Sequence, residues 1–169
     1  MPETINWKSL AEHLGTLRDG GEVGGSSYAR QVIESLIGEE NLRQAVEYYI
    51  DGKPGCELAR SVLWQIQPWS AMKHCYDIYK SDGDIGKRRI AVELLRVVAD
   101  RRAMGWITEF LEDKDQEIQI WGMGLLNQLV SSGSLSESET EELLTQAGTH
   151  ANPSVREIAA SIRRGLIRD

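Results

Sequence analysis

The chain contains little of the chemistry from which metal centres, redox sites and phosphate-binding loops are built. Its 169 residues include two cysteines, Cys56 and Cys75, and three histidines, and they contain no C-x-x-C, H-x-x-H or H-E-x-x-H motif. Such spacings bring thiolates or imidazoles to one metal ion. The phosphate-binding pattern G-x-x-x-x-G-K-[S/T] is also missing. We therefore expect no metal site, no cofactor and no catalytic residue, so the protein is not predicted to be an enzyme.

Long apolar runs are missing as well. No stretch approaches the ~20 apolar residues that a membrane-spanning helix needs, and the first residues lack the charged and apolar regions of a secretory signal. Two cysteines that share no motif do not indicate a disulfide framework. The sequence therefore predicts a cytoplasmic protein with reduced thiols and no membrane partner.

Basic residues are fewer than acidic ones. The chain has 19 Lys and Arg against 26 Asp and Glu, which gives a net charge of −7 and a pI near 5.1. An acidic surface repels phosphate, which argues against nucleic acid as the partner. The same charge suits a basic protein partner.

What the sequence does contain is an internal repeat. The stretch AMKHCYDIYKSDGD at 71–84 is followed thirty-two residues later by AMGWITEFLEDKD at 103–115. Both have apolar residues at relative positions 0, 4, 7 and 8, and a third copy of this spacing begins at Leu42. This is the spacing of one face of an amphipathic helix.

A second class of helix is anchored on a small residue. Each anchor has an apolar residue one position before it and, with one exception, apolar residues four and seven positions after it. The exception is Arg163, as expected of an outward-facing end helix. Small anchors let neighbouring helices approach closely, so a bulky side chain there should overpack the core. The anchors are Ala29, Ala59, Ala91, Gly122 and Ala159.

The two classes alternate along the chain, and turn residues separate them. Gly38, Pro68 and Asp100 are predicted to lie within helix pairs, and the Asp-rich stretches at 51–54, 81–84 and 113–115 between pairs. Asp before a helix caps its free N–H groups. We expect an all-α, right-handed superhelix of about four helix pairs plus end helices. Residues 1–169 would form one domain, with an N-terminal helix within 1–20 and repeats over 26–168.

Several stretches resemble a known repeat family. Val155-Arg156 followed by Ala159 matches the Val-Arg-x-x-small pattern of the HEAT-like repeats named after phycobilisome lyases, and Asp113, Asp115, Ile118 and Gly122 match it with Gln in place of Arg. Lys87-Arg88 with Ala91 departs further, and Gly55-Cys56 matches poorly. The resemblance implies a HEAT-like solenoid that binds partners on the concave side, along its second helices, and it implies no catalytic residues.

The repeat register selects candidate binding residues. On the second helices, the third and sixth positions lie on one side of the apolar stripe. They form a mixed aromatic and acidic ridge with Trp106 as its anchor, or else Trp106 packs against a neighbouring unit. Trp64 occupies a position that is polar in the equivalent helices, so we expect it to face solvent, whereas Trp121 is expected in the core. The predicted ridge consists of Tyr48, His74, Asp77, Trp106 and Glu109.

Three functions fit these observations. The first is a scaffold or adaptor that binds a protein or peptide on its concave face. The second is a small acidic inhibitor that neutralises a basic toxin or enzyme, as immunity proteins do. The third is a bilin lyase or chaperone, by analogy with the namesake of the repeat family.

Overall fold

The computed structural model describes residues 17–18, 21–22 and 27–166, and its secondary structure is almost entirely helical. The two short strands β1 (Leu17–Arg18) and β2 (Gly21–Glu22) form an antiparallel ribbon. The helices are α2 (Ser27–Ile37), α3 (Glu39–Ile50), α4 (Cys56–Ile66), α5 (Trp69–Ser81), α6 (Ile85–Val98), the 3-10 helix η1 (Arg101–Trp106), α7 (Ile107–Glu112), α8 (Gln116–Ser131), α9 (Glu137–Gly148) and α10 (Pro153–Leu166).

The predicted N-terminal helix is wrong where the structure describes it. Leu17 pairs with Glu22 and Arg18 pairs with Gly21 in the ribbon. Residues whose backbone pairs in a ribbon cannot also continue a helix, so the predicted helix does not extend to Leu17. The rest of the predicted helix, residues 1–16 and 19–20, lies outside the described residues.

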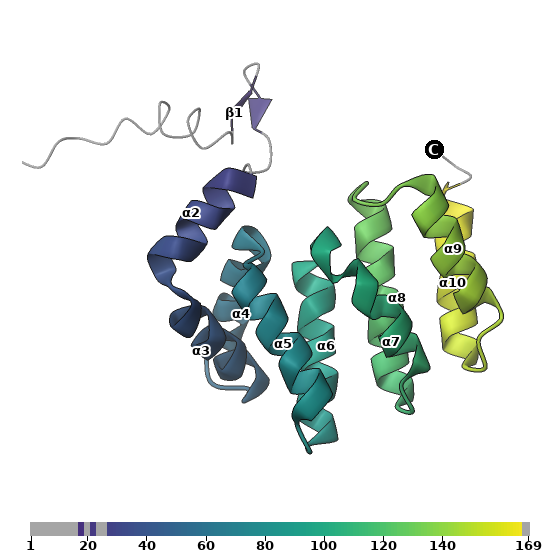
Figure 1. The fold of residues 1–169 in the computed structure, drawn as a ribbon, viewed down its shortest axis with the longest axis horizontal. Coiled ribbons are helices and arrows are strands. Elements are labelled where there is room, and N and C mark those ends of the chain that lie inside the picture. The colour runs from purple at the N-terminus through teal and green to yellow at the C-terminus, as the bar shows by residue number, and fades with distance from the viewer. Residues whose placement is uncertain (1–16, 19–20, 23–26, 167–169) are drawn as a thin grey trace, which may run out of the picture.

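The helices form two rows (Figure 1). The front row consists of α3, α5, α7 and α9, and the back row of α4, α6, α8 and α10. Consecutive helices joined by the turns before α4, α6, α8 and α10 pack closely as antiparallel hairpins. The sequence analysis placed the Asp-rich turns before α4, α6 and α8 between helix pairs. The structure places them within pairs, so the predicted pairing of the helices is wrong. The chain leaves one helix hairpin and enters the next at Gln67 (φ 43°) and Ala99 (φ 45°). These residues end α4 and α6 in the left-handed conformation.

The core lies between the two rows. All predicted apolar positions of the second helices are buried except Tyr49, which is half-buried, and the anchors Ala29, Ala91, Gly122 and Ala159 are buried too. Predictions at the edges of the first-helix stripe are wrong: Leu36, Leu58, Ile90 and Leu166 are exposed. Leu58 and Ile90 lie one position before their anchors, about 100° around the helix, and so at the margin of the buried face. Leu36 and Leu166 lie in the last turn of α2 and α10, the first and last helices of the array.

The predicted Asp caps are confirmed. Asp84 accepts hydrogen bonds from the backbone N–H groups of Gly86 and Lys87, and Asp115 accepts from those of Glu117 and Ile118. Each cap is preceded by an Asp two residues earlier whose carboxylate accepts from the cap's own N–H group, at 2.7 Å in the first turn and 2.8 Å in the second. The turns at 82–84 and 113–115 are therefore built in the same way, which the sequence repeat predicts.

Arginine side chains also contact the turns between helices. Arg88 pairs with Asp113 at 2.6 Å, so it reaches forward to the next Asp-rich turn instead of back to its own. Arg156 donates to the carbonyl oxygens of His150 and Ala151 instead of to an Asp. Arg163 was expected to point outward, but it pairs with Glu141 of α9 at 2.5 Å.

One cap comes from a distant helix. The residue before α5 is Pro68, whose side chain has no hydrogen-bond acceptor for the first N–H groups of the helix. Glu34 of α2 supplies the missing acceptor. Its carboxylate accepts hydrogen bonds from the backbone N–H groups of Trp69 (3.2 Å) and Ser70 (2.9 Å) and from the Ser70 hydroxyl (2.7 Å). Burial raises the pKa of Glu34, but these hydrogen bonds outweigh it and the net pKa is lowered.

We predict that Glu34→Gln lowers the free energy of unfolding by about 1 kcal/mol at neutral pH, less than a fully buried charged hydrogen bond contributes, because the carboxylate is part-exposed. Because the folded-state pKa is depressed, the contribution is present above the unfolded pKa and lost as pH falls through the folded pKa. Urea denaturation of both proteins across pH should show the difference fading below about pH 4. A constant difference down to low pH contradicts this assignment.

Ala91 gives a direct test of the helix crossings, because its side chain is fully buried. Ala91→Leu should overpack the contact and lower the free energy of unfolding by about 1–3 kcal/mol. Ala160→Leu, at an exposed position of α10, is the matched control and should change stability little. Equal denaturation midpoints for the two variants would contradict the predicted role of Ala91.

Candidate functional site

A stack of three aromatic rings joins α5 to the end of η1. The Trp106 ring lies 4.4 Å from that of Tyr76 at an interplanar angle of 15°, and 5.5 Å from that of Trp69 at 21°. Trp69 and Tyr76 are seven residues apart, which is two helical turns or about 10.5 Å along α5. Trp106 therefore inserts between two rings of the neighbouring helix, and the stack holds η1 against α5.

The stack continues into a polar junction at Glu109. This carboxylate receives the Tyr76 hydroxyl at 2.7 Å and the Lys80 ammonium at 2.8 Å. The hydrogen bond from Lys80, followed by that from Tyr76, lowers the pKa of Glu109. Burial, and then the hydrogen bond to Glu109, raises the pKa of Tyr76. Glu109 therefore stays ionised and fixes both side chains of α5 in place.

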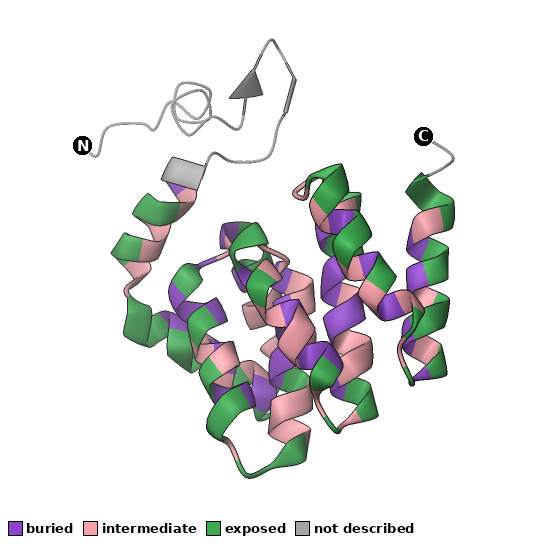
Figure 2. Ribbon diagram, turned by 45° about the vertical axis from the view of Figure 1, so that its right-hand side comes forward, coloured by how far each residue is buried: buried purple, intermediate pink, exposed green. Residues whose placement is uncertain are grey.

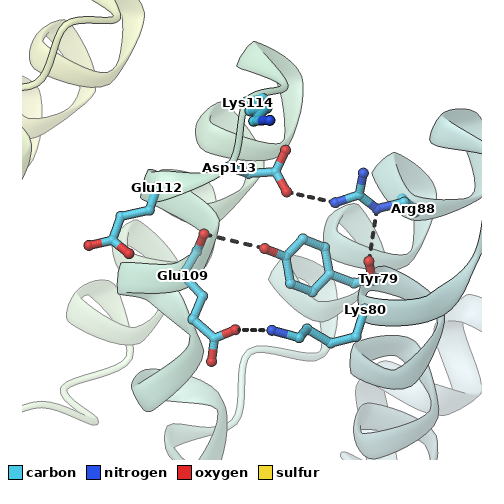
Figure 3. Close-up of a pocket in the computed structure, with 7 residues that line it drawn as sticks. All are labelled: Tyr79, Lys80, Arg88, Glu109, Glu112, Asp113 and Lys114. Atoms are coloured by element: carbon cyan, nitrogen blue, oxygen red, sulfur yellow. Dashed lines mark hydrogen bonds and ion pairs between the residues drawn. The ribbon is translucent and has the colours of Figure 1, made fainter.

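Next to Glu109 is an open hollow of about 380 Å³ between α5, α6 and the end of α7. Figure 3 shows two ion pairs across it, Lys80 with Glu109 and Arg88 with Asp113. Tyr79 lies between them and donates its hydroxyl hydrogen bond to the Glu109 carbonyl oxygen at 3.3 Å. Glu112 and Lys114 also line the hollow and form none of the drawn interactions, so their charges face solvent.

The other predicted ridge residues lie on α3 and α5. His74 contacts Glu47 of α3 at 2.7 Å, which links these two front-row helices. Asp77 pairs with Lys73 on its own helix, and the exposed Tyr48 donates its hydroxyl to the carbonyl oxygen of Pro54. The structure therefore places all five ridge residues on α3, α5, η1 and α7. The contacts between these helices involve two residues outside the predicted ridge, Glu47, which contacts His74, and Tyr76, which contacts Trp106 and Glu109.

The remaining tryptophans are divided between surface and core. Trp64 is exposed as predicted, but it lies on α4 of the back row, in a hollow with Arg60 and Arg96, so the structure does not bring it to the ridge. Trp121, predicted in the core, is half-buried, with the Arg96 guanidinium 5.1 Å from its ring centroid.

Sequence reasoning missed Tyr76, Trp69 and Lys80. Part of the signal was present, because Trp69 and Tyr76 are seven residues apart and Trp106 follows one repeat later, but Trp69 was expected in the turn before the helix. The sequence does not predict that Trp106 contacts residues of the preceding repeat, because this contact depends on how η1 crosses α5.

Charge separates between the two rows. The four front-row helices carry ten acidic and three basic side chains, a net charge of −7, whereas the four back-row helices carry four acidic and eight basic ones, a net charge of +4. Next to the front row, η1 adds Arg101 and Arg102, which pair with Glu139 and Asp100. The candidate surface is thus aromatic at α5 and η1 and acidic on α3, α7 and α9.

Two other kinds of site are absent from the described residues. No helix among them is long and apolar enough to cross a membrane. Over residues 27–166 and the short ribbon, no group of three His, Cys, Asp or Glu side chains is arranged to hold a metal ion.

Comparisons of the chain with protein-family models, with curated proteins and with solved structures found no match.

Proposed function

We propose that the protein is a non-catalytic interaction module, a HEAT-like right-handed superhelix that binds a basic protein segment along its front row. The observation that carries the proposal is the surface around Trp106, where an aromatic stack on α5 and η1 lies in the same row as the acidic helices α3, α7 and α9. Tryptophan and tyrosine are enriched among the few residues that carry most of the binding energy at protein interfaces, and complementary charge provides steering and specificity.

Repeated local geometry supports the HEAT-like interpretation. The Asp-x-Asp turns at 82–84 and 113–115 are 31 residues apart and make equivalent hydrogen bonds. The left-handed helix ends at Gln67 and Ala99 are 32 residues apart. Equivalent turns at a constant period repeat the same crossing, which produces a superhelix.

The rigidity of the surface supports binding. His74 with Glu47, and Tyr76 with Glu109, connect neighbouring front-row helices through side chains. Side chains that are already held in place lose little conformational entropy when a partner binds. A partner would therefore meet a largely preformed surface.

A charge-reversal experiment tests the proposal. Asp77→Lys with Glu112→Lys alters the front row, and Glu57→Lys with Glu117→Lys alters the back row by the same net charge; all four residues are exposed. The wild type and both variants are immobilised and incubated with lysate of the source cells. We expect a basic protein to be retained by the wild type and the back-row variant, lost by the front-row variant, and released by salt. Equal retention by the two variants would overturn the proposal.

The acidity of the front row also favours the inhibitor function. Its exposed carboxylates would complement a basic toxin or enzyme, as those of immunity proteins do. If the captured partner is an enzyme, its activity should fall when the wild-type chain is added and recover with the front-row variant. An enzyme that stays fully active in the complex points to the scaffold function instead.

A further inference from the structure

The back row contains an open hollow of about 410 Å³ that spans three neighbouring helices. Its lining combines an exposed tryptophan with two guanidinium groups, and none of the described residues that line it is acidic. We call it the back-row hollow. It is lined by Arg60, Ser61 and Trp64 of α4, Arg96 and Val97 of α6, and Gln128 of α8. Figure 2 shows that the surface of these helices is largely exposed or half-buried, as a binding surface must be.

Aromatic rings hold both guanidinium groups of the hollow in place. The guanidinium carbon of Arg60 lies 5.9 Å from the ring centroid of Tyr49, and that of Arg96 lies 5.1 Å from the ring centroid of Trp121. Arg96 also lies against the backbone of α8, because a Cβ atom on Gly124 would clash with its Cδ. A stacked guanidinium group keeps the N–H donors along its edge. Both arginines therefore lose little side-chain freedom when they bind a ligand.

Neither guanidinium group is saturated by the chain itself. Arg96 donates to Glu93 at 3.0 Å, and Arg60 forms an ion pair with Glu57 at 2.8 Å. The Glu57 side chain is 64% exposed, so water competes for this ion pair. A guanidinium group carries five N–H donors, so both arginines retain donors that have no acceptor among the described residues.

The chemistry of the lining indicates what the hollow binds. Trp64 and Gln128 form no hydrogen bond with any described residue, so an indole and a carboxamide N–H add to the donors of the two arginines. A carboxylate only accepts hydrogen bonds, and its bonds to guanidinium are among the strong ones in proteins. Trp64 is 53% exposed and adds a large ring against which an apolar group beside that carboxylate can pack.

The charge around the hollow favours a protein segment over nucleic acid. The four back-row helices carry a net charge of +4, which attracts an acidic group. The whole chain carries −7, so it repels a long polyanion with a charge on every nucleotide. A short segment with a few carboxylates meets the attraction of the back row and little of this repulsion.

We propose that the back-row hollow binds an acidic protein segment, with a carboxylate at the guanidinium groups of Arg60 and Arg96 and an apolar group of the segment on Trp64. The hollow lies on the row opposite to the surface around Trp106, so the proposal does not depend on the proposed function. If both proposals are right, one chain joins a basic partner on its front row to an acidic partner on its back row.

Fluorescence anisotropy with a short fluorescein-labelled peptide of glutamates around a central leucine tests the proposal. The wild type should bind this peptide, and Trp64→Ala should weaken binding about tenfold, as the loss of an interface anchor does. Leu166→Ala is the matched control, because Leu166 is 50% exposed on the same row but lies outside the hollow. Its variant should bind the peptide like the wild type.

A second pair of variants tests the two arginines at physiological ionic strength, where charges more than about 8 Å apart are largely screened. Arg60→Gln with Arg96→Gln should weaken binding of the peptide about tenfold or more. Lys87→Gln with Arg164→Gln removes the same charge from the back row outside the hollow and should weaken it far less. Circular dichroism checks that all variants stay folded.

A parallel titration with a labelled oligothymidylate separates the two classes of acidic partner. We expect it to bind more weakly than the glutamate peptide. Tighter binding of the oligonucleotide, no binding of the peptide by the wild type, or equal weakening by the hollow variants and their controls would each overturn the proposal.

Discussion

Replacing Phe110 by alanine should lower the free energy of unfolding by about 3–5 kcal/mol, the largest effect we expect from a single substitution. Phe110 is the only phenylalanine of the chain, and its side chain is fully buried. Its ring meets that of Tyr79 edge-on, with centroids 4.8 Å apart. Truncation would remove this contact and leave a cavity between α7 and the helices on either side.

The packing on the other side of Phe110 explains why the cavity should persist. A Cβ atom placed on Gly122 would lie 2.7 Å from the Cβ of Phe110, so α7 and α8 are already in backbone-close contact there. They cannot move closer to fill the space left by the ring. Phe110→Leu keeps most of the volume and should cost less than about 1.5 kcal/mol. Chemical denaturation of the two variants measures the difference, and similar midpoints would contradict it.

Replacing Trp106 by alanine should have two effects. Trp106 is half-buried and stacked on both Tyr76 and Trp69, so its loss should lower the free energy of unfolding by about 2 kcal/mol, less than a fully buried tryptophan would. If the proposed function is right, binding of the captured basic protein should also be lost. The sequence analysis left two alternatives for Trp106, a binding anchor and a packing residue. Because Trp106 is both stacked and part-exposed, it can act as both.

Trp64→Ala separates these effects from the general cost of losing a tryptophan. Trp64 is 53% exposed on the back row, so its truncation should change stability by less than about 0.5 kcal/mol and leave binding intact. Thermal or chemical melts give the stability of both variants, and titration with the partner gives the binding. If Trp106→Ala is as stable as Trp64→Ala, the ring stack contributes nothing to the fold.

The sequence by itself determined that residues 27–166 are helical, roughly where most of these helices lie, and which sides of the front-row helices are buried. Apolar residues at 0, 4, 7 and 8 leave one side of a helix able to enter a core, so Val46, Cys75 and Ile107 are buried as predicted. Asp84 and Asp115 cap helices for an equally local reason, since a carboxylate two or three residues away accepts the free N–H groups.

Tertiary structure alone decided which helices meet and which apolar residues stay exposed. Nothing local shows that Glu34 caps α5 or that Trp106 enters the preceding repeat, because both contacts join residues about 30 or more apart through the crossing angles of helices. For the same reason Val62 and Leu94 occupy one repeat position and differ in burial. A repeat pattern specifies the side that a helix buries, whereas the neighbour that covers it depends on where the helix lies in the array.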